Sequence, residues 1–122
     1  MSRILATGVI AALVVGGAAW AQTPAVYTWT GYGVNVPGSS KCPTYKMTIN
    51  VTVSGDKVTA LFQQEGRQER HFEANKDAKG MFRTTAVVGG GNVIQVSGTI
   101  NDAESTVLLD GYCKFGGPMA KR

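Results

Sequence analysis

Hydrophobic and polar positions alternate most strictly in residues 45–54 of this chain. One face of this segment carries lysine, threonine, asparagine and serine side chains, and the other carries Tyr45, Met47, Ile49, Val51 and Val53. A period of two in a run rich in β-branched residues predicts a half-buried β-strand. The Ser-Gly-Asp-Lys stretch that follows is typical of a hairpin turn.

Six further segments show the same alternation, more weakly, in residues 26–33, 57–63, 67–74, 81–88, 93–100 and 106–115. Turns rich in glycine, aspartate and asparagine separate them at intervals of roughly eight to twelve residues, which is the pattern of an all-β domain. Residues 63–79 form the one candidate helix, but Phe72 is the only hydrophobic anchor there, so we favour strands. The expected inward-facing side chains are Tyr27, Trp29, Val58, Ala60, Phe62, Arg70, Phe72, Ala74, Phe82, Thr84, Ala86, Val88, Ile94, Val96, Ile100, Val107, Leu109, Cys113 and Phe115.

Successive hairpins of this kind predict an all-β antiparallel meander of about seven or eight short strands. Such a meander must protect its two edge strands, and closing into a small barrel is the simplest way to do so. A two-sheet sandwich is the alternative architecture.

The first 21 residues have the pattern of a secretory signal peptide. Arg3 precedes an apolar run from Ile4 to Val15, and Ala19-Trp20-Ala21 matches a cleavage site. We therefore expect a signal peptide over residues 1–21 and a single secreted β domain over residues 22–122. The alternative, a retained membrane anchor, is disfavoured because the apolar run is short for a bilayer. Cleavage would place the protein in the bacterial periplasm or outside the cell, with no transmembrane segment.

The chain has two cysteines, Cys42 and Cys113, so only one intramolecular disulfide is available. In an oxidising compartment two such cysteines are expected to pair. Their wide separation argues against a redox C-x-x-C motif and against a structural zinc site, which takes four ligands. We expect Cys113 to lie in the last strand, so that the disulfide fastens this strand to the start of the sheet.

The segments placed so far resemble a known group of proteins. The carrying motifs are C-P-T-Y ahead of an alternating strand, the glycine-marked hairpins, V-S-G-T-I from Val96, the late C-K-F, and the basic A-K-R ending. Together they are similar to a group of small, uncharacterised secreted alphaproteobacterial β-meander proteins. Those relatives often have tryptophan where this chain has Phe115. The resemblance implies secretion, the disulfide and the meander, and it implies no catalytic residue.

The charge of the chain is mildly positive. Twelve lysines and arginines against eight acidic residues give a net charge of +4, which falls to +3 when Arg3 is removed. This is far from the basic stripe of a nucleic-acid-binding protein, and no nucleic acid partner is expected. A candidate surface patch for an anionic partner is Arg67, Arg70, Lys76, Lys79 and Arg83. Acidic residues interspersed among them favour the simpler interpretation of a soluble surface.

Residues for catalysis are sparse. His71, the one histidine, has Glu69 and Glu73 on the same strand face, and this arrangement is more typical of an exposed charged face than of an acid–base pair. Asp102 and Glu104 fit a turn better than a calcium loop. We expect no catalytic residue, no metal and no cofactor.

Aromatic side chains offer a second candidate site. Small barrels either fill with side chains or hold one small ligand, and the candidate ligand-binding residues are Tyr27, Trp29, Tyr45, Phe82 and Tyr112. A packed core is the default alternative. The favoured function is a non-enzymatic secreted or periplasmic binding protein, interacting with a protein or an envelope component, or acting as an inhibitor through the loop at residues 33–43. The alternatives are a carrier of a small apolar ligand and an enzyme using His71.

Overall fold

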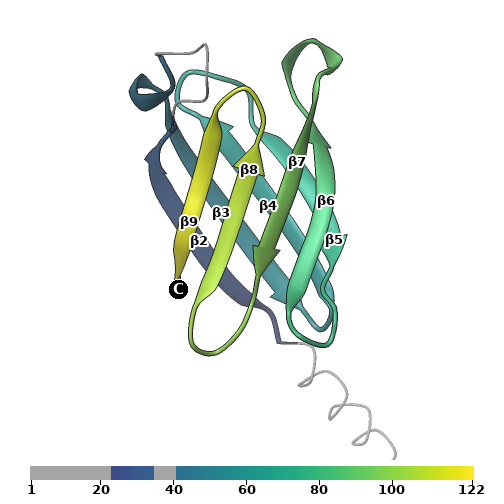
Figure 1. Ribbon diagram of the computed structural model, residues 1–122. Coiled ribbons are helices and arrows are strands. Elements are labelled where there is room, and N and C mark those ends of the chain that lie inside the picture. The colour runs from purple at the N-terminus through teal and green to yellow at the C-terminus, as the bar shows by residue number, and fades with distance from the viewer. Residues whose placement is uncertain (1–22, 35–40) are drawn as a thin grey trace, which may run out of the picture.

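A computed structural model describes residues 23–34 and 41–122, so the predicted signal peptide lies outside the described residues. The described chain forms eight strands and two short 3-10 turns (Figure 1). None of these residues belongs to a helix with the length and hydrophobicity needed to cross a bilayer. The strands are β2 (Ala25–Tyr32), β3 (Lys46–Ser54), β4 (Lys57–Gln64), β5 (Arg70–Asn75), β6 (Met81–Val87), β7 (Val93–Thr99), β8 (Ser105–Asp110) and β9 (Lys114–Lys121).

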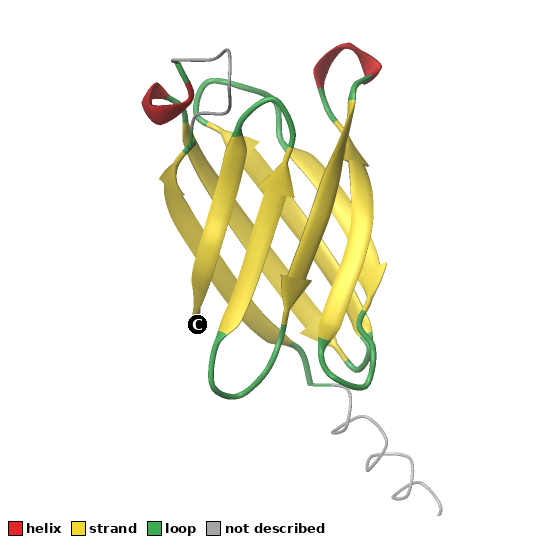
Figure 2. Ribbon diagram, in the orientation of Figure 1, coloured by secondary structure: helices red, strands yellow, loops and turns green. Residues whose placement is uncertain are grey.

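The eight strands make one antiparallel sheet in the order β5-β4-β3-β2-β9-β8-β7-β6. Every hydrogen-bonded pair joins consecutive strands except β2 with β9, where the register pairs Tyr27 with Lys121 and Thr28 with Ala120. Figure 2 shows the sheet curving back on itself, so that its two ends, β5 and β6, lie next to each other. The predicted all-β antiparallel meander in a barrel shape is confirmed, and the barrel is nearly closed.

The side where β5 faces β6 is called the β5–β6 seam below. In the described chain these two strands share no ladder of backbone hydrogen bonds, although they are in contact. Aromatic packing spans this seam instead: the rings of Phe72 on β5 and Phe82 on β6 are stacked 6.1 Å apart. Phe62 on β4 lies 6.2 Å from Phe72 and extends the row. The seam is therefore joined by side chains at a place where other strand pairs are joined by the backbone.

The barrel interior is filled by the side chains that the alternation predicted. Ile49, Val51 and Val58 are fully buried, and the three phenylalanines of the aromatic row are at most 4% exposed. Tyr27 and Trp29 face the same interior, since β2 pairs them with Val51 and Ile49. Burial of these alternating faces is the main stabilising contribution to the fold.

The disulfide between Cys42 and Cys113 is confirmed. Cys42 begins the 3-10 turn η1 (Cys42–Thr44) ahead of β3, as the sequence indicated. The prediction that Cys113 lies in a strand is wrong, because residues 111–113 form a bend between β8 and β9. The Gly111 N–H donates to the Cys113 carbonyl oxygen at 3.1 Å, and this tight bend breaks the alternating segment 106–115 into two strands.

The last strand, β9, was not predicted as a separate element, since its Gly-Gly-Pro sequence is typical of a loop. The structure shows why glycine is needed there. Gly116 has φ +134°, and a Cβ at this position would collide with the Val107 carbonyl oxygen on β8. The glycine thus allows two backbones to approach more closely than any side chain would permit.

Candidate functional site

The connections between the strands lie at the two ends of the barrel, and the longest, between β2 and β3, spans residues 33–45. In an up-and-down meander alternate connections lie at the same end, and Figure 1 shows residues 33–34, 41–45, 65–69, 88–92 and 111–113 together at one end. This end is called the loop end below, and its residues 35–40 lie outside the described part of the chain. The opposite end, called the turn end, carries the connections 55–56, 76–80 and 100–104, each of five residues or fewer.

One side of the loop end is braced by the disulfide and by backbone contacts. The Val34 N–H donates to the Lys114 carbonyl oxygen at 2.8 Å, and the Lys114 N–H donates back at 3.3 Å. Gly33 fits between the Cys42 carbonyl and the Phe115 ring, where an added Cβ would lie 2.7 Å and 2.9 Å from those groups. The start of the β2–β3 connection and the β8–β9 bend are thereby held as one unit.

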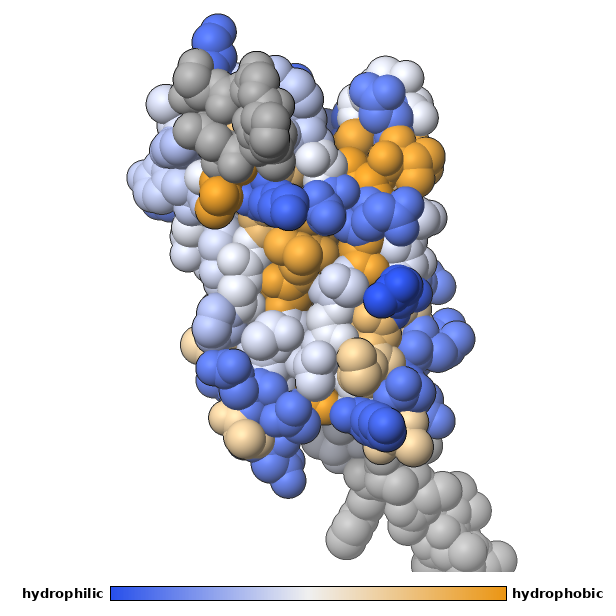
Figure 3. All heavy atoms as spheres, viewed as in Figure 1, coloured by the Kyte–Doolittle hydropathy of each residue, from blue (hydrophilic) through white to orange (hydrophobic). Residues whose placement is uncertain are grey.

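Exposed hydrophobic side chains concentrate at the loop end. Among the described residues, five of the seven large hydrophobic side chains that remain exposed lie there, at strand ends or in loops. Figure 3 shows hydrophobic surface in the upper half of the face formed by β6–β9, beneath the β6–β7 loop. Such grouping is typical of an interaction surface. The five residues are Tyr32, Val34, Val87, Val93 and Tyr112.

The loop end also contains a pocket of about 360 Å³, called the mouth pocket below. It lies between the β4–β5 and β6–β7 connections. Buried Met47 and Phe62 supply apolar surface, and Val88 adds to it from the edge of the β6–β7 loop. The rest of the lining is polar or glycine: Gln64, Gly66, Arg67, Gln68, Arg70 and Gly89.

Two arginines, Arg67 and Arg70, are among the residues that line the mouth pocket, and neither has a carboxylate partner in the described chain. The ion pairs within the described residues are Lys57–Glu73 and Lys76–Asp56, and neither includes Arg67 or Arg70. The Arg70 side chain reaches from the start of β5 toward the β6–β7 loop, since a Cβ added to Gly89 would lie 3.7 Å from its guanidinium. Arg70 and Gln68 also line a groove of about 490 Å³ along the β5–β6 seam, so the groove and the mouth pocket meet.

The structure does not gather the candidate basic patch into one surface. Arg67 and Arg70 lie at the loop end, Lys76 and Lys79 lie in the β5–β6 turn at the turn end, and Arg83 is exposed on β6 between them. Lys76 is also paired with Asp56 at 4.0 Å.

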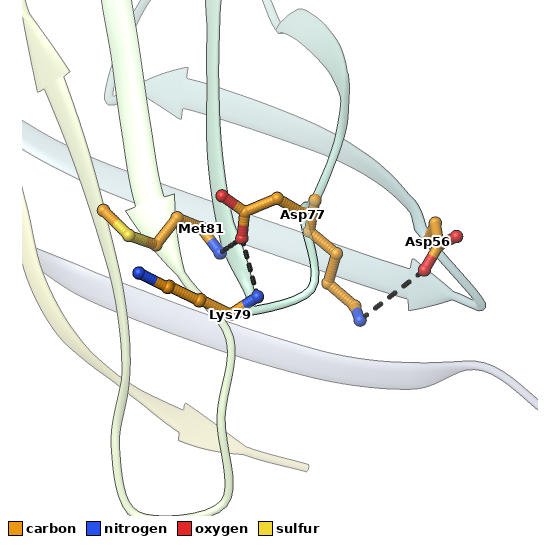
Figure 4. Close-up of polar contacts among 5 residues, drawn as sticks. Asp56, Asp77, Lys79 and Met81 are labelled. Carbon is orange, nitrogen blue, oxygen red and sulfur yellow. Dashed lines mark hydrogen bonds and ion pairs between the residues drawn. The ribbon is translucent and has the colours of Figure 1, made fainter.

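Asp77 organises the β5–β6 turn (Figure 4). Its carboxylate accepts the backbone N–H groups of Lys79 and Met81, both at 2.9 Å. The hydrogen bond from Met81 is the main cause that lowers the pKa of Asp77 below its usual value. The turn end is therefore arranged by local hydrogen bonds and ion pairs around its charged residues.

The candidate ligand-binding aromatics are spread along the barrel. Tyr27 lines a pocket at the turn end, and Phe82 belongs to the aromatic row in the core. Trp29 is partly buried over Gly31 and Gly117, while Tyr45 is half-buried beside η1 and Tyr112 is 72% exposed on the β8–β9 bend. The sequence did not predict the mouth pocket. The alternation identified Met47 and Phe62 only as core residues, and no sequence signal indicated that they line the same pocket as Arg67 and Arg70.

His71 is exposed on β5, in shallow grooves that it shares with Glu73. No hydrogen bond from His71 to Glu69 or Glu73 exists within the described residues, and Glu73 is instead 3.9 Å from Lys57. The described chain also brings together no group of three or more histidine, cysteine, aspartate or glutamate side chains suited to a metal ion.

Comparisons with protein-family models, with curated proteins and with solved structures found no match to this chain.

Proposed function

We propose that this protein is a non-enzymatic binding protein of the bacterial periplasm or extracellular space, and that it contacts a partner protein through the loop end. The observation that carries this proposal is the concentration of exposed hydrophobic side chains at that end. Monomeric proteins rarely leave such groups together without a partner, and tyrosine is enriched in protein interfaces.

Two further features support the proposal. The disulfide braces the corner that carries Val34 and Tyr112, which reduces the conformational freedom that binding would otherwise remove. Disulfides also persist mainly in oxidising compartments, in agreement with the signal peptide predicted for residues 1–21. The resemblance to small secreted alphaproteobacterial proteins points the same way.

Site-specific photocrosslinking in the periplasm of producing cells tests the proposal. A photoreactive phenylalanine analogue replaces Val93 or Tyr112 at the loop end, and matched controls replace Leu61 or Met81, which are similarly exposed elsewhere. We expect discrete crosslinked products from the loop-end positions alone, and excess unlabelled protein should suppress them. Equal labelling at all four positions, or none at any, would overturn the proposal.

A further inference from the structure

The mouth pocket combines features that the proposed protein partner does not require. Met47, Phe62 and Val88 supply the apolar part of its lining, with Met47 and Phe62 only 6% and 2% exposed, and Arg67 and Arg70 add two positively charged residues to the same lining. Few ligand classes suit both the apolar lining and the positive charges of the mouth pocket. A purely apolar ligand would gain nothing from the two charges, and a simple inorganic anion would gain nothing from the apolar part of the lining.

We propose that the mouth pocket binds a small amphipathic anion, with its apolar chain against Met47 and Phe62 and its carboxylate at Arg67 and Arg70. Guanidinium groups bind carboxylates through paired, charge-assisted hydrogen bonds. The volume of about 360 Å³ is within the range of small-molecule sites. This site goes beyond the proposed protein binding and does not depend on it.

The availability of the arginines supports this ligand class. Neither guanidinium has a carboxylate within ion-pair distance in the described chain, whereas Lys57 and Lys76 are already paired. Arg70 is only partly exposed and crosses toward Gly89, so its charge stands at the edge of the pocket instead of extending into open solvent. An anion placed there gains more from the charge than it would at a fully exposed side chain.

The neighbouring elements provide an entry route. Residues 89–91 are all glycine, so these three positions of the β6–β7 loop place no side chain over the mouth. The groove along the β5–β6 seam joins the mouth pocket at Gln68 and Arg70, and the described seam has no backbone hydrogen bonds to break. A ligand with a chain can therefore enter from the loop end, whereas the seam groove is lined by Glu69 and Glu73 and is closed beneath by Phe72.

Titration calorimetry on the purified mature protein tests the site with three probes of equal chain length: octanoate, octanol and octylamine. We expect saturable binding of octanoate, binding of octanol weaker by about tenfold, and no binding of octylamine, because only the anion satisfies the arginines. Absence of saturable binding at about 5 mM octanoate, or equal affinity for all three probes, would overturn the proposal.

Three variants locate the binding. Arg70→Met keeps much of the apolar stem and removes the charge, so it should weaken octanoate by about tenfold and leave octanol nearly unchanged. Gly89→Leu should weaken both probes by filling the mouth, and its added Cβ meets only the Arg70 guanidinium at 3.7 Å, an ordinary contact. Arg83→Met makes the same charge change on the outer face of β6, outside the mouth pocket, and should leave both affinities unchanged.

Urea denaturation of each variant confirms folding before binding is compared. Co-sedimentation with phosphatidylglycerol vesicles separates a free amphipathic acid from a lipid surface. If the protein binds the vesicles, and neither octanoate nor Arg70→Met reduces that binding, the proposed site is overturned. Loss of the crosslinks described above would leave these titrations unchanged, so the two proposals fail separately.

Discussion

Removing the Cys42–Cys113 disulfide should destabilise the fold by an amount that its position determines. The cysteines are separated by 71 residues, and the chain-entropy model assigns a crosslink over such a loop about 4 kcal/mol. A domain of this size is stable by only about 5–15 kcal/mol, so the loss is a large fraction of the total. Cys42 is fully buried, so replacing it also removes packing contacts.

The Cys42→Ala/Cys113→Ala double variant tests this value by urea unfolding at neutral pH. We expect a free energy of unfolding lower by about 4 kcal/mol and a melting temperature lower by roughly 15–30 °C. The urea m-value should rise, since the unfolded chain without its crosslink exposes more surface. The reduced wild-type protein is the control, because it loses the crosslink but keeps both sulfur atoms. A loss below about 1 kcal/mol with an unchanged m-value would refute the reasoning.

Three other substitutions test the packing and the turn chemistry. Gly98→Ala should lower the free energy of unfolding in urea by about 1–3 kcal/mol, because the added Cβ would collide with the Phe82 ring. The neighbouring Ser97→Ala is the control and should change stability by less than about 0.5 kcal/mol. Equal losses for the two variants would contradict the predicted clash. Asp77→Asn should lower the free energy of unfolding at neutral pH. The difference in stability between wild type and variant should shrink as the pH falls below about 3.8 and through the lower folded pKa, because a lowered pKa stabilises the fold only while the carboxylate is ionised. A stability difference that is constant with pH would show that the charge of Asp77 does not matter. Phe72→Ala should cost about 3–5 kcal/mol, because this ring packs against both neighbours of the aromatic row and is 2% exposed, and a loss below about 1 kcal/mol would show that the seam is held in another way.

Much of the fold could be predicted because alternation reports directly on burial. Met47, Ile49, Val51 and Val53 are all buried, as their spacing in one strand required. The hairpin at Gly55 was readable from its turn residues, and Gly55 has φ +62°. The disulfide followed from a count of two cysteines.

The remaining features depend on contacts between distant residues. β9 contains Gly116 because Val107 on another strand leaves no space for a Cβ, and a sequence shows only the glycine. The mouth pocket brings Arg70 of β5 beside Gly89 of the β6–β7 loop, and this proximity results from the curvature of the sheet, which places β5 next to β6. Four of the five candidate basic residues fell at opposite ends of the barrel because β5 separates Arg70 from Lys76 by its full length, and Arg83 lies on β6 between them.

The pairing of β2 with β9 also sets the order in which the barrel can assemble. All other pairings join neighbouring strands, and such local hairpins form in microseconds. β2 gains its second neighbour only through residues 120 and 121, so it retains a free edge until the end of the chain has been made. Closing so distant a pair is the slow step expected for a fold of high contact order. Until that pairing forms, β2 presents an unpaired strand edge through which chains can aggregate, in addition to the edges that β5 and β6 keep at the seam.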